Sequence, residues 1–304
     1  MSDSAGREHT GAIFTALFVT VLWASSWVLI RIGLDNEGLS PLLFAGGRYL
    51  FASLVLAVLV AGTPRLRTEI RELPRARWAQ LGLLGLVFVA VAQGAQFVAI
   101  DAQPAATSSL VLSLTPLIVA GVSTLALAER PTARQLAGTA LIVVGAIAYF
   151  SGDIGFTAVG MIAAVIGLVA NAISALMGRG INRARDMSPV IVTVVSMTIG
   201  ALALVVSGIV IEGMPSVSGR AWLIIAWLAV VNTAWAFTLW NRSLQQLSAT
   251  ESAAINNTML IQIGVLAWLF LDETPGPLDI IGMIAVSIGV YLAQRPRPEV
   301  RSVE

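Results

Sequence analysis

The chain offers few side chains that could carry out covalent or metal chemistry. Its 304 residues include no Cys and a single His, His9, and all 18 basic residues are Arg. Its apolar segments therefore hold no Ser–His or Ser–Lys pair, no thiolate nucleophile and no zinc ligand set. Glu251 alone among the acidic residues falls inside an apolar segment away from its extreme ends. The sequence also has no phosphate-binding glycine loop. We expect a protein that is not an enzyme and needs no cofactor or metal.

Amide side chains occur within otherwise apolar segments, where they need polar surroundings. Gln93 and Gln96 lie about one helical turn apart in one segment, and Asn256, Asn257 and Gln262 lie in another. Two interpretations stay open. The amides line a cavity that holds water or solute, or they form hydrogen bonds that hold neighbouring helices together.

Pro116 falls near the middle of a further apolar segment. A proline there removes one helical hydrogen bond and clashes with the preceding turn. Ser109, Ser113 and Pro116 fall on one helix face, and this pattern predicts a polar, locally irregular surface. That surface either borders a cavity or is a structural kink that a Ser or Thr hydroxyl repairs.

Aromatic residues accompany these polar positions. Trp23 and Trp27 lie four residues apart near the N-terminus, and Asn232 and Trp235 lie together in a later segment. A lining of amides and aromatic rings suits an amphipathic organic solute. The alternative for the Trp residues is packing in the core or anchoring at a membrane interface.

Arg48 lies well inside an apolar segment, roughly 10 Å from its start at about 1.5 Å per residue. An uncompensated Arg in hydrocarbon costs at least about 2.5 kcal/mol, so its guanidinium must be hydrated, paired or bound to an anionic group. Two roles stay open: an anchor for a solute carboxylate, or a fixed ion pair or carbonyl contact that holds its helix against its neighbours. Arg31 and Arg179 lie nearer to helix ends, and we expect them to extend to the membrane interface.

Ten apolar blocks contain these residues and set the fold class. Apolar residues make up 57% of the chain and charged residues 12%, about half of the ~25% usual in soluble domains. A helix needs about 20 apolar residues to cross a bilayer. The pattern excludes a soluble globular protein, a disordered chain, a nucleic-acid binder and a membrane β-barrel. We expect an all-α integral membrane protein with ten transmembrane helices at 12–33, 41–61, 77–99, 105–127, 133–150, 157–178, 189–211, 221–243, 249–271 and 277–294.

Arg residues gather in alternate breaks between these blocks, most densely at 65–77 and 179–185. The opposite breaks contain Arg220 as their one basic residue, together with several acidic residues. Because cytoplasmic loops are enriched in basic residues, the Arg-rich side is predicted to face the cytoplasm. An even number of helices then makes 1–11 and 295–304 cytoplasmic tails of a multi-pass protein in the cell membrane.

The second half of the chain repeats the first. A shift of 144 residues aligns 78–145 with 222–289 without a gap, and a shift of 148 residues aligns the first two blocks of each half. The halves, 12–150 and 157–294, each have five expected helices. Because five is odd, the second copy must enter the membrane inverted, and inverted repeats of this kind build secondary transporters.

Short motifs in both halves resemble a known family, the EamA type of the drug/metabolite transporter superfamily. The motifs are WASSW at 23–27 followed by Arg31, SLTPL at 113–117, AERP at 128–131 and FLDE at 270–273. The second copy has Leu260 where the family usually has Pro, so the resemblance does not imply a symmetric helix break there.

The resemblance implies a secondary transporter that moves a small organic metabolite or drug-like solute by alternating access, most often as an exporter. The expected partners are that solute and membrane lipid, not nucleic acid. A lipid scramblase or a non-transporting membrane scaffold is the alternative. The energy source stays open between a facilitator and coupling through a residue at a cavity mouth, such as Glu251 or Asp101.

Glycines at equivalent places in the two halves indicate close helix packing. Gly138 and Gly145 lie two turns apart in one block, and Gly282 and Gly289 repeat this spacing in the other half. The contact they make is either within a monomer or between the subunits of a homodimer.

Overall fold

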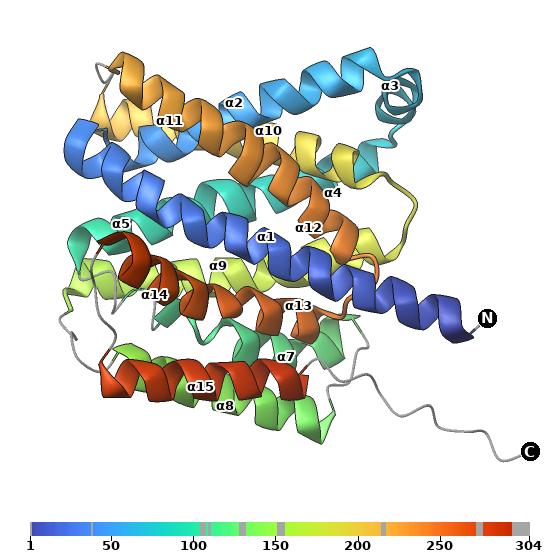
Figure 1. The fold of residues 1–304 in the computed structure, drawn as a ribbon. Helices are drawn as coiled ribbons and strands as arrows, with labels where there is room; N and C mark the ends of the chain where they lie inside the picture. The colour runs from blue at the N-terminus through green and yellow to red at the C-terminus, as the bar shows by residue number, and fades with distance from the viewer. Residues whose placement is uncertain are drawn as a thin grey trace, which may run out of the picture.

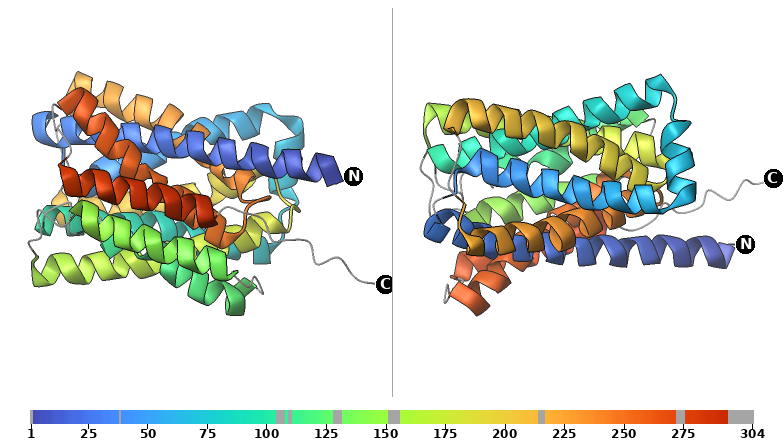
Figure 2. Two further views of the ribbon diagram at one scale, coloured as in Figure 1. Left: turned by 60° about the horizontal axis from the view of Figure 1, so that its bottom comes forward. Right: turned by 90° about the horizontal axis from the view of Figure 1, so that it is seen from above.

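A computed structural model describes residues 2–37, 39–103, 108, 111–127, 132–150, 156–213, 217–271 and 276–293 of the chain. Within these residues every regular element is a helix. Most helix axes are roughly aligned, so the helices form a bundle (Figures 1 and 2). The start of α1 and the end of α15 lie at the same end of the bundle (Figure 1).

The first half of the chain contains α1 (Ser2–Glu37), α2 (Pro41–Gly62), α3 (Pro64–Arg71), α4 (Arg75–Gly85), η1 (Leu86–Gln93), α5 (Gly94–Ala102), α7 (Thr115–Leu127) and α8 (Ala133–Phe150). The second half contains α9 (Ala158–Arg183), α10 (Pro189–Glu212), α11 (Gly219–Ala229), η2 (Val230–Trp235), α12 (Ala236–Ser243), α13 (Ala249–Asn256), α14 (Thr258–Leu271) and α15 (Pro277–Ala293). The elements η1 and η2 are π-helical turns inside otherwise continuous helices.

Six helices among the described residues are long and apolar enough to cross a membrane. They are Glu8–Ser26, Pro41–Gly62, Arg75–Ala99, Ala158–Arg183, Pro189–Glu212 and Gly219–Ser243. Two shorter apolar helices are Ala133–Tyr149 and Pro277–Ala293. The all-helical membrane class is therefore confirmed, whereas the ten crossings and their inverted arrangement stay predictions.

The first helix begins earlier than the sequence suggested. Residues 2–11, expected to form a tail, continue α1 as a helix. Glu8 and His9 in this segment contact Gln246 and Glu251, next to the start of α13, and these contacts hold the added turns against the bundle. The expected tail at 295–304 lies outside the described residues.

The segments expected at 105–127 and 249–271 are both interrupted. In the first, the chain turns at Ser113 and Leu114 before α7 begins, and in the second it turns at Asn257, 144 residues after Ser113. Beside each turn a Thr hydroxyl donates to a carbonyl three residues back, from Thr115 to Leu112 O at 2.6 Å and from Thr258 to Ile255 O at 2.7 Å.

These hydroxyl bonds satisfy carbonyls beside the turn and favour a bend. The kink at Pro116 is thus repaired by a Thr hydroxyl. The second half bends at the matching place although it has Leu260 where the first half has Pro116.

Helices α8 and α15 pack against each other through glycines. A Cβ built on Gly138 would lie 2.5 Å from Gly289 O, and one built on Gly145 would lie 2.7 Å from Gly282 O. The pairing of the earlier glycine of one helix with the later glycine of the other shows that the helices are antiparallel (Figure 1). These glycines therefore serve a contact within the chain.

Helices α2 and α10 also lie side by side. Helix α2 begins beside a carboxylate from the end of α10, and α10 begins beside a carboxylate of α3, the helix that follows α2. Glu212, the last residue of α10, accepts hydrogen bonds from the N–H groups of Leu42 and Leu43 at 3.0 and 3.1 Å. Glu69, just beyond α2, accepts from the N–H of Ser188. A carboxylate at a helix N-terminus stabilises both unpaired N–H groups and the helix dipole.

The glycine contact predicts opposite effects for two similar substitutions. Gly145→Ala places a methyl group against backbone oxygen, and we expect a loss of about 1–3 kcal/mol in stability from overpacking. Gly121→Ala has no atom within 4 Å of the added Cβ and should be neutral or stabilising, because Ala favours helix. Thermal unfolding of the purified variants in detergent measures the difference. Equal melting temperatures for both variants would contradict the packing described.

Candidate functional site

The guanidinium of Arg48 is buried where α2 meets the π-helical turn η2. Only 7% of Arg48 is exposed. Its Nε donates to Thr233 Oγ1 at 2.7 Å, its Nη2 lies 3.5 Å from Asn232 O, and its Cζ lies 5.4 Å from the ring centre of Tyr49. These described partners are all neutral, and the two roles expected for Arg48 both stay predictions.

The π-helical turn explains how η2 can receive this charge. Thr233 Oγ1 donates to Leu228 O, five residues earlier, at 2.7 Å, and its lone pairs are left to accept from Arg48. Asn232 O accepts from the indole Nε1 of Trp23 at 3.1 Å and also faces Arg48. Wider turns of this kind occur mostly as short bulges, frequently at functional sites.

Helix α1 also contacts this site, through hydrogen bonds with Asn232 of η2. Asn232 Nδ2 donates to Ser25 Oγ at 3.1 Å and to Leu22 O. Trp23 and Ser25, both in the WASSW motif, therefore bind the turn that also holds Arg48. Asn232 is 1% exposed, and its Oδ1 is buried with no hydrogen-bond partner among the described residues.

Aromatic rings cover the polar group. The Trp23 ring lies 4.8 Å from that of Phe237 and 5.1 Å from that of Trp240, between ring centres. Tyr49 and Phe88 approach Phe237 at 6.0 and 5.5 Å. Arg48, Asn232 and Trp23, predicted from separate sequence patterns, thus meet beside one aromatic cluster.

A second polar group joins α1 to α14. The hydroxyls of Thr20 and Thr258 lie 3.2 Å apart, and Gln262 Nε2 donates to them at 3.0 and 3.2 Å. Gln262 Oε1 is buried without a hydrogen-bond partner among the described residues. These contacts are the interhelical hydrogen bonds that formed one of the two interpretations for Gln262.

The other amide candidates are not hydrogen-bonded to Arg48 in the described part of the chain, and they differ in how deeply they are buried. Gln93 and Gln96 are half-buried at the junction of η1 and α5. Asn256 is exposed at the last residue of α13, and Asn257 is half-buried in the bend that follows. In this conformation we find no hydrogen bond that links these four side chains to Arg48 in the described part of the chain.

The candidates on the segment that contains Pro116 are only partly described. Ser113 and Pro116 are buried beside the turn that precedes α7. Ser109 lies outside the described residues, and so does the side chain of Trp27, although the backbone of Trp27 belongs to α1.

Trp235 does not join the buried polar group. It is 50% exposed and continues a line of exposed apolar side chains on α11 and η2, which also contains Leu223, Trp227 and Val230. Its ring packs edge-on against Phe18 at 5.6 Å. A large exposed apolar ring suits contact with lipid, and the placement of Trp235 in a cavity lining stays a prediction.

Arg179 is 9% exposed, and its Nη1 donates to Leu244 O at 2.7 Å. The guanidinium thus binds the backbone just after α12, where a carbonyl beyond a helix end offers an acceptor. Its approach to the membrane interface stays a prediction.

A family model matches the chain in two successive copies, at 10–151 and 158–294, and its description is EamA-like transporter family. The chain belongs to this family. Over 286 residues it is 28% identical to a probable terminal-alkyne amino-acid exporter of Streptantibioticus cattleyicolor, with 93% of each chain covered. It is 26% identical to a probable amino-acid metabolite efflux pump of Escherichia coli, with 91% of this chain and 92% of the relative covered.

A relative from Salmonella typhimurium, also a probable amino-acid metabolite efflux pump, is 24% identical, with 92% of this chain and 93% of the relative covered. A solved crystal structure matches the fold with a TM-score of 0.77 at 16% identity, covering 93% of this chain and 98% of that one. Membership of the EamA-like family and these relatives identify a multi-pass membrane transporter of small metabolites. The family and the names of its members indicate transport and not catalysis.

Sequence reasoning missed two members of the polar groups in this EamA-like protein. Thr20 gave no signal, because a single Thr in an apolar helix usually bonds its own backbone. Tyr49 is adjacent to Arg48 in sequence, but its ring contact with the guanidinium depends on side-chain direction.

The geometry predicts that the Thr233 hydroxyl contributes more to the free energy of unfolding than the hydroxyl of Thr238, a few residues later in the chain. Thr233→Val keeps the shape of the side chain but removes the acceptor of Arg48, and hydrogen bonds to charged groups are each worth about 1.5–3 kcal/mol. Among the described residues, the Thr238 hydroxyl bonds Ala234 O in its own helix alone, so Thr238→Val is the matched control. Thermal unfolding should show a clear loss for Thr233→Val and little change for Thr238→Val. A similar loss in both variants would mean that Arg48 does not depend on Thr233.

Proposed function

We propose that this EamA-like protein exports a small amino-acid-like metabolite across the cytoplasmic membrane by alternating access. The observation that carries the solute class is the buried Arg48, whose described partners are neutral. A guanidinium matches the geometry of a carboxylate in a bidentate contact. Relatives named as amino-acid exporters or efflux pumps, matched over nine-tenths of the chain, support the class and the direction of transport.

The same site offers a second group for an amino-acid backbone. Asn232 Oδ1 is a buried acceptor without a partner among the described residues, and a buried acceptor of this kind lacks the hydrogen bond that native groups almost always have. A solute ammonium group is a suitable donor. In our proposal the solute carboxylate replaces the neutral contacts of Arg48 during the transport cycle, and the Trp23–Phe237–Trp240 cluster contacts the apolar part of the solute.

The proposal requires a path that opens to either side, and we assign its lining to the predicted polar positions that are not part of the Arg48 site. Gln93, Gln96, Asn256 and Asn257 are exposed or half-buried, as cavity-lining amides would be. Ser113 lies beside the helix break of the same region, where an irregular backbone requires protein or water around it.

We propose further that ten helices form two inverted five-helix repeats. The antiparallel pairing of α8 with α15 supports this arrangement, because the two helices are the last of their halves and an inverted copy runs in the opposite direction. The π-helical turns η1 and η2 begin 144 residues apart, at Leu86 and Val230. The helix breaks at Ser113 and Asn257 have the same separation.

Arg48 is predicted to control transport as well as folding. Arg48→Gln removes the charge and should abolish export, while Arg48→Lys keeps the charge but loses the planar fork and should raise KM. Efflux of radiolabelled amino acids from proteoliposomes measures both. Arg220→Gln, at the exposed start of α11, is the control and should transport normally.

Normal transport by Arg48→Gln, at equal expression and thermal stability, would exclude the solute-anchor role. Exchange of phospholipid between the leaflets without flux of any amino acid would favour a scramblase over an exporter.

The proposed orientation makes a prediction for surface labelling, and the chain has no Cys that would need removal. Phe156 and Arg183 flank opposite ends of α9. Single Cys residues at Phe156 and Arg220 should react with an impermeant maleimide from outside intact cells. Cys at Arg71 and Arg183 should react only after lysis, because Arg-rich loops stay in the cytoplasm. Labelling of Arg71→Cys in intact cells would reverse the orientation.

A further inference from the structure

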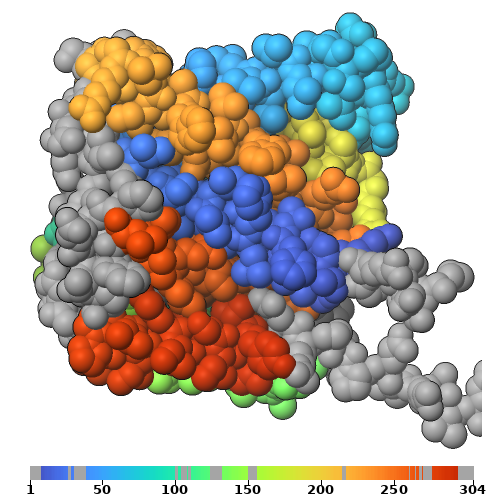
Figure 3. Space-filling view, viewed as in Figure 1, coloured from blue at the N-terminus to red at the C-terminus, as the bar shows by residue number. Residues whose placement is uncertain are grey.

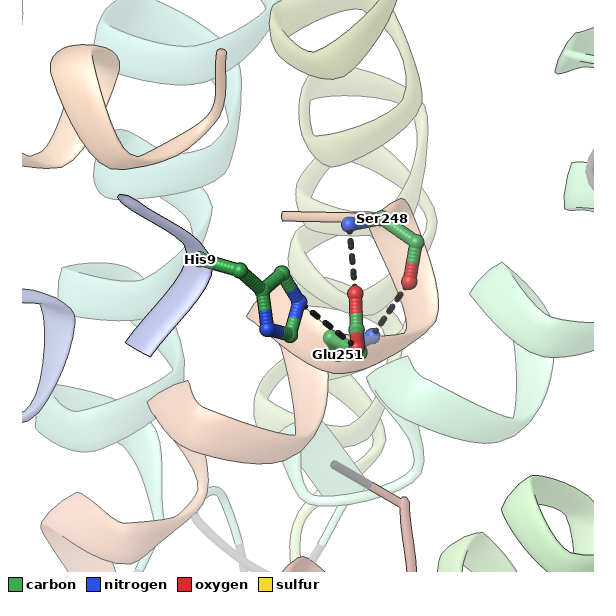
Figure 4. Close-up of polar contacts among 3 residues, drawn as sticks. All are labelled: His9, Ser248 and Glu251. Carbon is green, nitrogen blue, oxygen red and sulfur yellow. Dashed lines mark hydrogen bonds and ion pairs between the residues drawn. The ribbon is translucent and has the colours of Figure 1, made fainter. Parts of the chain in front are cut away.

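His9 and Glu251 face each other across the contact between α1 and α13 (Figure 4). His9 Nε2 lies 3.2 Å from Glu251 Oε1, and the two side chains are 26% and 8% exposed. His9 is the only His in the chain, so it is the only side chain whose unperturbed pKa, about 6.5, places its charge change near neutral pH. The one His and the one acid within an apolar segment therefore form a pair.

The carboxylate of Glu251 has a second, independent set of contacts. Its Oε2 accepts from the N–H of Ser248 at 2.8 Å, while the N–H of Glu251 donates to Ser248 Oγ at 3.2 Å. These reciprocal bonds form a capping box at the start of α13. Glu251 therefore keeps a hydrogen bond from the backbone when His9 moves away.

The rest of this contact is apolar. Beyond the His9–Glu251 pair, the small side chains of Ala12 and Ala16 pack against Leu247 and Ile255. Figure 3 shows α1 on this face of the molecule between α12 and the α13–α14 segment. Opening the contact between α1 and α13 would expose a mainly apolar surface. The His9–Glu251 pair lies at one end of that surface.

Other charged or titratable groups on the elements packed against α1 and α13 are few. Among the side chains that the structure describes they are Glu8 on α1, Arg134 and Tyr149 on α8, Arg179 and Arg183 on α9, Arg220 on α11, Arg242 on α12, and Asp279 and Tyr291 on α15. Helix α1 also contains Asp3, Arg7, Arg31, Asp35 and Glu37, whose side chains lie outside the described ones. Glu8 accepts from Gln246 Nε2 at 3.2 Å, and Arg179 binds Leu244 O. Only His9 among these groups titrates near neutral pH when unperturbed.

We propose that His9 and Glu251 form a proton-binding latch that closes the α1–α13 contact when His9 is protonated and lets it open when His9 is neutral. Protonation gives an ion pair between imidazolium and carboxylate, and loss of the proton leaves only a weaker contact with a neutral ring. The role of this latch in transport rests on the proposed export function: the latch would tie the opening of the α1 end of the bundle to the pH on that side of the membrane.

The test measures opening directly, without a solute. Ala16 is fully buried in the contact, and Ala16→Cys in the Cys-free chain reports its opening by reaction with N-ethylmaleimide. Rates from pH 5.5 to 8.0 are divided by those of Glu72→Cys, an exposed position, which removes the intrinsic pH dependence of the thiol. We expect the ratio to rise at least about threefold with pH, since release of one proton permits up to about tenfold per pH unit.

Variants separate the latch from a general effect of pH. His9→Gln and Glu251→Gln, the latter able to keep the capping box, should each make the ratio independent of pH. Glu8→Gln, which removes a neighbouring acid on the same helix, should keep the wild-type dependence. A ratio that does not change with pH in the wild type, or that changes equally in His9→Gln, would overturn the latch.

The outcome also separates this inference from the export function. Amino-acid efflux together with a pH-independent ratio would overturn the latch alone. A pH-dependent ratio in a protein that moves no amino acid would overturn the export function and leave the latch in place.

Discussion

A charged guanidinium inside an apolar helix bundle must be surrounded by acceptors that the protein itself supplies, and this constraint organises the centre of the molecule. Arg48 reaches η2 because a π-helical turn places Thr233 Oγ1 and Asn232 O toward it. The same turn fixes α1 through Trp23 and Ser25. The consecutive helices α1 and α2 are therefore held at one point to η2, from the other half of the chain, by hydrogen bonds, which in an apolar environment cannot be exchanged for bonds to bulk water.

The contact between α2 and η2 has an equivalent in the contact between α10 and η1, and the two contacts are made by different groups. The 148-residue shift aligns Arg48 with Ser196, and the 144-residue shift aligns Thr233 with Val89. Where the first contact has a guanidinium, the second has backbone against backbone: a Cβ on Gly85 would lie 1.9 Å from Ser196 O, and one on Gly200 would lie 2.6 Å from the Cβ of Val89. The contact between α2 and η2 is therefore made through side-chain hydrogen bonds, whereas α10 packs closely against the end of α4 and the start of η1.

Local polarity identified positions that matter but did not distinguish their roles. Asn232 and Gln262 were expected to face protein or water, and both do so as hydrogen-bond donors between helices. Trp235 has the same local surroundings as Asn232 but is half-exposed. Residues three apart are neighbours on the surface of a regular α-helix, whereas the π-helical turn η2 spaces its residues differently. A spacing based on a regular helix therefore does not fix the direction of these side chains.

The amino-acid sequence by itself determined the membrane class, the positions of most apolar helices, the doubling of the chain and the family resemblance. These features depend on local quantities, namely the length of apolar segments, the placement of Arg and short motifs, and therefore they can be read along the chain. Only the tertiary structure decided which groups meet. The partners of Arg48, the bend at Asn257 without a proline, and the contact of His9 with Glu251 all depend on helices brought together from distant parts of the chain. A buried polar group takes whichever acceptor packing brings within about 3 Å, and no local pattern specifies that neighbour.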